Sequence, residues 1–202
     1  MLTIALPKGR IADETLNKFE KAFNEKFIFE DRKLILEKNN FKFLSVRNQD
    51  VPTYVMHGAA DLGVVGLDVL EEKEYDLIKL LDLKFGKCKV AFGLKKGEKI
   101  NFDKSLVKIA TKHEKIAKKY FEEKAMAVEI IKLYGSIELA PLVGLCDYIV
   151  DIVETGETMK QNGLEVGPTI MESTAHLIAN KNSFYSKKDL IFSLKDKLEE
   201  YL

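Results

Sequence analysis

The sequence lacks tryptophan and has only two cysteines, Cys88 and Cys146, among its 202 residues. Because these cysteines lie far apart and form no CxxC pair, we expect free, buried thiols rather than a structural disulfide. No apolar run approaches the roughly 20 residues that a membrane helix needs. The apolar segment 2–6 is too short for a signal peptide, and basic residues follow it instead of preceding it. These absences favour a cytoplasmic protein without a membrane partner.

The sequence also lacks an excess of charge. Its 32 basic and 32 acidic residues balance, so the composition gives no general attraction to nucleic acid, and we expect no such partner. His57, His113 and His176 are widely spaced and match no metal signature, so we expect no metal held by protein side chains alone. Neither a GxGxxG fingerprint nor a Walker A loop is present, and any nucleotide must be bound by other means.

Strand-like and helix-like segments alternate along the chain. Apolar spacing predicts a helix over 11–23, and Thr111 with Glu114 has the capping-box spacing of another helix start. A terminal amphipathic helix is expected over 190–201. Strands are expected at 2–6, 34–36, 41–46, 62–65, 77–81, 90–94, 107–110 and 128–133. This alternation predicts an α/β fold with mainly parallel sheets.

One strand-to-helix junction carries the clearest chemical signal. An apolar run over 147–153 leads directly into Glu154-Thr-Gly-Glu-Thr158, and Thr158 with Gln161 has capping-box spacing, so a helix is expected to start at Thr158. Hydroxyls and backbone N–H groups at such a start suit a phosphate, while the neighbouring acids suit sugar hydroxyls. The pattern therefore indicates a phosphorylated ribose. An ordinary acidic strand-to-helix turn is the alternative from these residues alone.

Several blocks, taken together and in order, carry a resemblance to a known family. They are 2–10 (LTIALPKGR), 47–54 (RNQDVPTY), 58–68 (GAADLGVVGLD) and 133–145 (LYGSIELAPLVGL), the last continuing into the junction at 147–156. Together they resemble the ATP phosphoribosyltransferase family, the first enzyme of histidine biosynthesis. The resemblance extends from Leu2 to about Asn180. The length is similar to that of the family's short form, which lacks the C-terminal regulatory domain of the long form.

The resemblance implies a two-lobed, type II periplasmic-binding-protein-like architecture, with the substrates held in a cleft between two α/β lobes. The first lobe would comprise residues 1–90 and 178–202, and the second, residues 91–177, would carry the phosphoribosyl-binding loop. The implied reaction joins N1 of the ATP adenine to C1 of phosphoribosyl pyrophosphate (PRPP) and releases pyrophosphate. Also implied are Mg²⁺ carried by the substrate phosphates and a separate regulatory subunit similar to histidyl-tRNA synthetase, in a homo-oligomer or hetero-oligomer.

Candidate residues for PRPP lie at the junction. Asp151 and Glu154 are candidates for the ribose hydroxyls. The 5′-phosphate is assigned to Thr155, Gly156, Glu157 and Thr158, largely through backbone N–H groups. A capping role for Asp151 and simple solvent exposure for Glu157 remain open.

Candidates for ATP and pyrophosphate lie mostly near the N-terminus: Lys8, Arg10, Arg32, Arg47, Asp68 and Cys88. Arg10 and Arg32 are also the catalytic candidates, because a guanidinium fork matches the oxygens of a departing pyrophosphate. Asp68 would meet a base or a cation at the end of the glycine-containing segment 63–68. Structural ion pairs remain the alternative for each arginine, and a buried structural thiol is the alternative for Cys88.

Two other functions fit the same reasoning. A small-molecule sensor or solute-binding protein would share the bilobal fold, but it would give the junction at 151–158 no special purpose. A different phosphoribosyl-binding enzyme would use the junction and change the second substrate. Pyrophosphate release in the presence of ATP and PRPP separates the transferase from a binding protein, which would bind without turnover.

Overall fold

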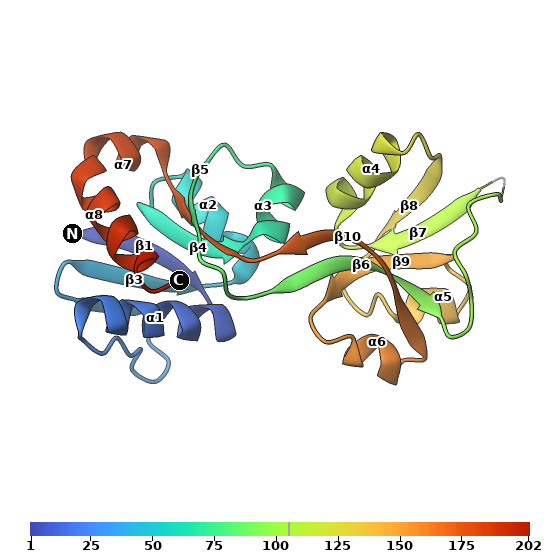
Figure 1. Cartoon of the computed structure of the whole chain (residues 1–202), viewed down its shortest axis with the longest axis horizontal. Coiled ribbons are helices and arrows are strands. Elements are labelled where there is room, and N and C mark those ends of the chain that lie inside the picture. Colours follow the sequence, from blue (N-terminus) through green and yellow to red (C-terminus); the bar gives the residue numbers. More distant parts are fainter. Residues whose placement is uncertain (105) are drawn as a thin grey trace. The chain divides into compact units, whose positions relative to one another are not determined.

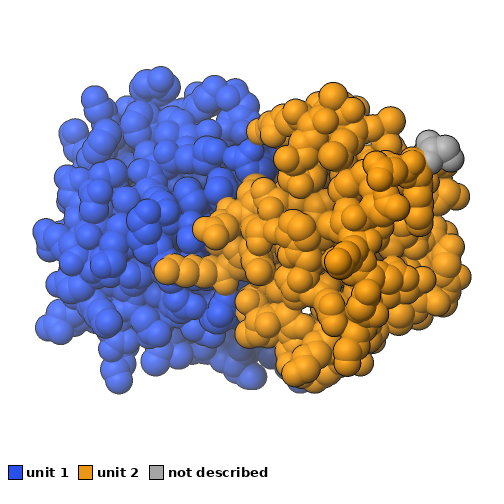
Figure 2. All heavy atoms as spheres, turned by 45° about the vertical axis from the view of Figure 1, so that its right-hand side comes forward, with its two compact units in different colours: residues 1–86, 174–202 blue, residues 87–173 orange. Residues whose placement is uncertain are grey.

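The computed structural model describes residues 1–104 and 106–202, and these form two compact units. Unit 1 comprises Met1–Gly86 with Thr174–Leu202, and unit 2 comprises Lys87–Ser173 (Figure 2). The sequence placed the two lobe boundaries at residues 90 and 178, a few residues after the observed unit boundaries at 86 and 174. The difference arises because whole strands stay in one sheet: β6 (Cys88–Lys95) pairs within unit 2, and β11 (Ala175–Ala179) pairs within unit 1.

Unit 1 is built on a six-stranded sheet in the order β2-β3-β1-β4-β11-β5, in which β1 runs parallel to β3 and β4. Its other strands are β1 (Leu2–Pro7), β2 (Ile35–Lys38), β3 (Phe41–Val46), β4 (Leu62–Gly66) and β5 (Ile78–Asp82). Its helices are α1 (Arg10–Phe23), α2 (Val51–Met56), α3 (Leu67–Lys73), α7 (Lys181–Ser186) and α8 (Lys188–Glu199), with a 3-10 turn at Asn48–Asp50.

Helices cover both faces of the unit 1 sheet. Side chains alternate along its strands, so neighbouring residues pack against helices on opposite faces. Ile4 of β1 packs in a cluster with Phe19 of α1 and Leu194 of α8, whereas its neighbour Ala5 packs with Val55 of α2. The predicted helix over 11–23 and the terminal helix are confirmed as α1 and α8. Because helices cover both faces, only the ends of the parallel strands remain for ligands, as in other open α/β sheets.

Unit 2 is built on a five-stranded sheet in the order β10-β6-β9-β7-β8. Its other strands are β7 (Val107–Thr111), β8 (Val128–Lys132), β9 (Tyr148–Val153) and β10 (Leu164–Ser173). Its helices are α4 (Glu114–Glu123), α5 (Leu139–Leu142) and α6 (Glu157–Gln161). Figure 1 shows α4 on one side of these strands and α5 and α6 on the other, and a buried apolar cluster lies on each side.

Each sheet mixes parallel and antiparallel pairs, so the expectation of mainly parallel sheets is wrong. β7 runs parallel to β8 and β9, but β6 is antiparallel to both β9 and β10. The antiparallel pairs of unit 2 occur where the chain enters and leaves it, because β10 must run back along β6 before β11 rejoins unit 1, whereas in unit 1 β2 also pairs antiparallel with its neighbour β3. None of the helices in the described residues has the length and apolar composition to cross a bilayer.

A buried carboxylate joins the C-terminal helices to the first strand of unit 1. Asp61 accepts hydrogen bonds from the Thr3 N–H at 2.8 Å, Ser183 Oγ at 2.7 Å and Lys187 Nζ at 2.8 Å. Burial raises the pKa of this carboxyl, but the bonds from Lys187, Thr3 and Ser183 outweigh it and hold the pKa below the ordinary 3.8. The stability that Asp61 contributes is therefore fully present above the ordinary pKa of 3.8. It is lost as the pH falls through the lower pKa that the carboxyl has in the folded protein.

We expect Asp61→Asn to lower the free energy of unfolding by about 2 kcal/mol at neutral pH, because charge-assisted bonds to a buried carboxylate are lost. Urea titrations at pH 7 and pH 3 should show a smaller difference from the wild type at pH 3. Asp189→Asn, at an exposed position of α8, is the matched control and should change little at either pH. An equal loss at both pH values for Asp61→Asn would contradict this assignment.

Candidate functional site

A polar hollow of about 370 Å³ lies where β9 ends in unit 2. Strand β9 passes through the middle of the sheet and finishes at Val153, and the chain then turns through Glu154, Thr155 and Gly156 into α6. We call the end of the sheet where the parallel strands β7 and β9 finish the carboxyl edge of unit 2. The lining residues are Lys112, Glu138, Asp151, Ile152, Val153, Glu154, Thr155, Gly156, Thr158 and Met159.

Asp151 is the most buried carboxylate of the hollow, with 9% of its side chain exposed. Its Oδ1 accepts the Ile152 N–H at 2.7 Å, lies 3.0 Å from Lys112 Nζ and lies 3.9 Å from His113 Nε2. Among the described residues, all three of these groups contact Oδ1, so this oxygen is the anchored atom and Oδ2 is the one that a ligand can use. A fixed carboxylate of this kind is suited to accepting hydrogen bonds from hydroxyls.

The turn after β9 depends on a glycine in the left-handed region. Gly156 has φ 80° and is the N-cap residue of α6, and Thr155 Oγ1 accepts the Glu157 N–H at 3.3 Å. The capping box expected at Thr158 and Gln161 is wrong, because the helix begins at Glu157 and Gln161 donates to the Glu157 carboxylate. Thr158 lines the hollow, whereas Glu157 is exposed and lies outside the lining.

The expected capping box at Thr111 and Glu114 is also wrong. Helix α4 begins at Glu114 with His113 as its N-cap, and the His113 N–H donates to Thr111 Oγ1 at 2.9 Å. This turn places Lys112 beside Asp151. Sequence reasoning missed both Lys112 and Glu138 as lining residues. The signal that could have found Lys112 is its position directly after a strand, since parallel neighbours finish at the same edge of a sheet.

The basic candidates of unit 1 gather at the corresponding end of its own sheet. Lys8 follows β1 and donates its backbone N–H to Val46 at 3.1 Å, and Arg47 follows β3 directly. Arg10 begins α1, with its Nε 3.6 Å from Glu14 Oε1. Arg32 precedes β2, and the bond from the Ser45 N–H to the Leu34 carbonyl puts this segment at the same end of the sheet. The fold thus brings Lys8, Arg10, Arg32 and Arg47 to one end of unit 1.

The two remaining candidates, Cys88 and Asp68, lie in different units. Cys88 begins β6, so it belongs to unit 2 and not to the first lobe; it is half-buried, and both cysteines are free thiols. Asp68 is 3% exposed in the first turn of α3, just beyond β4. Gly63 has a packing role, because a Cβ there would lie 2.7 Å from Val55 Cγ2. In the described residues, no group of three or more His, Cys, Asp and Glu side chains could hold a metal ion.

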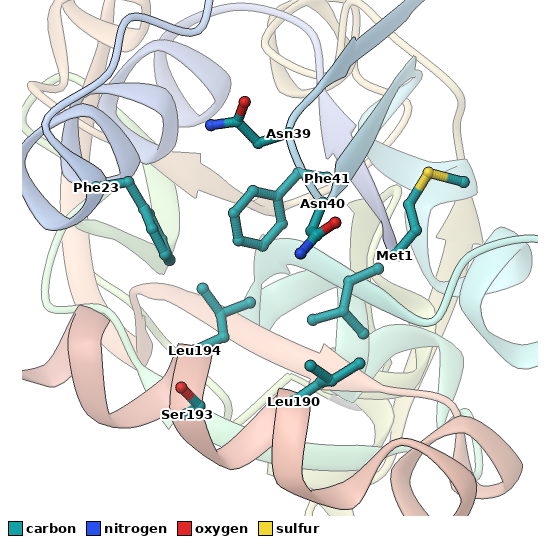
Figure 3. A pocket seen from close by; sticks show the side chains of 9 residues that line it. Met1, Phe23, Asn39, Asn40, Phe41, Leu190, Ser193 and Leu194 are labelled. Carbon is teal, nitrogen blue, oxygen red and sulfur yellow. The ribbon is translucent and has the colours of Figure 1, made fainter.

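A different hollow, of about 250 Å³, lies at the opposite end of β1 in unit 1 (Figure 3). Figure 3 shows Phe23, Phe41 and Leu194 facing one another beside the amide of Asn40. The side chains that line this hollow are apolar or uncharged. It therefore offers no charged side chain to a phosphate, and the polar hollow of unit 2 is the better candidate for a charged sugar ligand.

Comparisons with known proteins also indicate a phosphoribosyl-binding enzyme. The sequence model of HisG, ATP phosphoribosyltransferase, matches residues 47–200. The ATP phosphoribosyltransferase of Wolinella succinogenes is 67% identical over 195 residues, which cover 96% of this chain and 95% of that protein. The ATP phosphoribosyltransferase of Campylobacter fetus subsp. fetus is 65% identical over 202 residues, covering 100% of both chains.

Solved structures show the same fold. A chain of the ATP phosphoribosyl transferase (HisG:HisZ) complex from Thermotoga maritima matches with a TM-score of 0.83 and 38% identity, covering 99% of this chain and 98% of that chain. The periplasmic aliphatic sulphonate binding protein SsuA of Escherichia coli matches with a TM-score of 0.64 and 13% identity, over 98% of this chain and 71% of that chain. This second likeness supports the periplasmic-binding-protein-like architecture and nothing about ligands.

We expect Gly156→Ala to destabilise the protein more than Gly163→Ala. Both glycines have positive φ, 80° and 75°, so each substitution should cost roughly 1–2 kcal/mol of backbone strain. A Cβ at Gly156 would also lie 2.9 Å from Val166 Cγ2, whereas a Cβ at Gly163 meets nothing within 4 Å. Urea unfolding should show the excess loss, and Val166→Ala should relieve it in the double variant. Equal losses for the two single variants would show that the turn accommodates a side chain.

Proposed function

Because the chain belongs to the ATP phosphoribosyltransferase family, we propose that its PRPP substrate binds at the carboxyl edge of unit 2. The enzyme catalyses the first step of histidine biosynthesis, in which N1 of the ATP adenine joins C1 of PRPP and pyrophosphate leaves. One observation supports the location most strongly. The polar hollow joins two carboxylates, Asp151 and Glu154, to the turn at 155–158, which is what a sugar carrying a phosphate requires.

The carboxylates would hold the ribose. Asp151 is held through Oδ1 and can use Oδ2 to accept a hydrogen bond from a ribose hydroxyl. Glu154 lies at the start of the turn and can accept one in the same way. The 5′-phosphate would then meet Thr155, Gly156 and Thr158. Thr158 lines the hollow with its hydroxyl available, and the positive φ of Gly156 turns the backbone towards it. Glu157 lies outside the lining, so we assign it no contact with the sugar.

The leaving group requires positive charge, because negative charge grows on pyrophosphate while the ribose ring becomes positive. Preorganised cations stabilise such charge where it develops. We propose Arg10 and Arg32 as the catalytic cations, with Lys8 and Arg47 binding the phosphates of ATP and PRPP. Asp68 and Cys88 complete our assignment of the ATP region. Neutral adenine N1 already has a lone pair, so we assign no general base.

The side chains of this site fit a Mg²⁺ ion that is held mainly by the substrate phosphates. The described residues contain no cluster of three or more ligand side chains, and Mg²⁺ commonly binds through substrate phosphates while keeping several waters. We therefore propose that Mg²⁺ arrives with the substrate phosphates, where it would offset their negative charge when bound. The three acids of the hollow, Glu138, Asp151 and Glu154, remain available to the sugar.

We further propose that a second protein regulates the enzyme. The Thermotoga maritima structure is a HisG:HisZ complex, and the present chain covers 98% of the chain that it matches. A subunit similar to histidyl-tRNA synthetase would carry histidine feedback to this chain in a hetero-oligomer. We expect the enzyme to act in the cytoplasm. A solute-binding protein shares the fold at only 13% identity, so that alternative has no specific support.

We expect Arg10→Lys to lower kcat roughly 10- to 100-fold while raising either KM much less. Lysine keeps the charge but loses the two-pronged guanidinium, and charge on pyrophosphate grows mainly in the transition state. Steady-state pyrophosphate release measures both constants. Glu14→Gln is the control, since it removes the negative charge of one ion pair of Arg10, keeps the guanidinium and should leave kcat nearly unchanged. A rise in KM with unchanged kcat would assign Arg10 to ground-state binding.

We expect the isolated chain to turn over ATP and PRPP without inhibition by histidine. The physical reason is that feedback couples two sites, and we assign the histidine site to the second subunit. The measurement is a histidine titration at subsaturating substrate, first with the chain alone and then with the candidate subunit added. Inhibition of the chain alone would place the effector site within these residues and refute the proposed division of labour.

A further inference from the structure

The polar hollow of unit 2 has an unbalanced charge. Among the described residues that line it, Glu138, Asp151 and Glu154 are acids and Lys112 is the cation. PRPP brings a 5′-phosphate and a pyrophosphate, so the ligand is a polyanion that the acids would repel. The position of Lys112 therefore decides which part of the ligand finds positive charge in unit 2.

The backbone of Lys112 is fixed, whereas its side chain, which pairs with Asp151, is partly exposed. His113 as a whole residue is 1% exposed, and its backbone N–H donates to Thr111 Oγ1, so the turn that carries Lys112 is fixed. The register of β7 against β9 pairs Thr111 with Val150, which carries Lys112 alongside Asp151. The Lys112 side chain is 38% exposed, whereas that of Asp151 is 9% exposed. The lysine can therefore move between partners, and the aspartate cannot.

The order of groups along β9 indicates which end of the sugar would face Lys112. The phosphate turn begins just after Glu154, and Asp151 precedes Glu154 by three residues, roughly 10 Å along an extended strand. A ribose with its 5′-phosphate at the turn extends its C2 and C1 atoms towards Asp151. Lys112 Nζ lies 3.0 Å from Asp151 Oδ1, so it is at the C1 end, where pyrophosphate is attached.

We propose that Lys112 binds the pyrophosphate group of PRPP from unit 2. In the free protein its ammonium neutralises Asp151, and in the complex it contacts the leaving group next to C1 while Asp151 Oδ2 accepts a ribose hydroxyl. This inference rests on the proposed location of PRPP. It adds Lys112, a cation of unit 2, to the residues proposed for the leaving group.

The simpler possibility is that Lys112 only neutralises and orients Asp151. The two roles differ in which ligands should bind more weakly when the lysine is removed. A pure positioning role weakens every ligand that has the ribose hydroxyls. Direct contact with pyrophosphate weakens PRPP and spares ribose 5-phosphate, which has the same hydroxyls and the same 5′-phosphate but no pyrophosphate.

The test is calorimetric titration of the full chain with PRPP and with ribose 5-phosphate, at equal Mg²⁺ and ionic strength. Lys112→Met should weaken PRPP roughly 10- to 100-fold, the range expected for a lost bond to a charged group, and should weaken ribose 5-phosphate less than about threefold. Lys112→Arg should keep most of the PRPP affinity. Lys118→Met on α4 removes the same charge from an exposed pair with Glu122 and controls for long-range electrostatics.

Two results would overturn the inference. An equal loss for both ligands in Lys112→Met would show that the lysine acts only through Asp151, and no loss for either would show that it has no role in binding. Asp151→Asn separates this from failure of the proposed PRPP site, because it should weaken both ligands. If Asp151→Asn leaves both affinities unchanged while Lys112→Met weakens PRPP, the hydroxyl assignment is wrong. An unchanged thermal midpoint for each variant confirms that it folds.

Discussion

The site in unit 2 depends on the parallel alignment of β7 with β9. That pairing brings the residue after Thr111 next to Asp151, and the ion pair between Lys112 and Asp151 stabilises a buried negative charge beside the phosphate turn. Burial of an unpaired carboxylate would be costly, whereas a paired one with a single anchored oxygen is ready to bind hydroxyls without rearrangement. The proposed places of the ribose, its 5′-phosphate and Lys112 all follow from the position of this carboxylate.

The sequence allowed the α/β class, helices α1 and α8 and the junction after β9 to be predicted, because each depends on local periodicity or a local run of residues. Both capping boxes were wrong, since Gly156 and His113 occupy the N-cap positions by backbone conformation and neither caps through its side chain. Lys112 has a sequence signal, its position directly after a strand, but its place beside Asp151 also requires the pairing of β7 with β9. Glu138 has no such signal, because its place in the hollow follows from how the α5 region packs.

Non-local contacts also explain what the sequence left open in unit 1. Gly63 belongs to a glycine-containing segment that suggested a nucleotide, but its lack of a side chain serves the contact with α2. Asp61 has no sequence pattern that indicates its structural role, yet it joins β1 to the C-terminal helices through Thr3, Ser183 and Lys187. The basic residues Lys8 and Arg47 were predicted as phosphate candidates from the sequence, and the pairing of β1 with β3 brings them to one end of the sheet.

A crystal structure of the chain with PRPP and Mg²⁺ tests the central claim most directly. We predict that the ribose hydroxyls will lie within hydrogen-bond distance of Asp151 Oδ2 and Glu154, with the 5′-phosphate on the turn at 155–158. PRPP bound elsewhere, with Asp151 still contacted only by Lys112, His113 and the Ile152 N–H, would contradict the account and leave the carboxyl edge of unit 2 without a substrate.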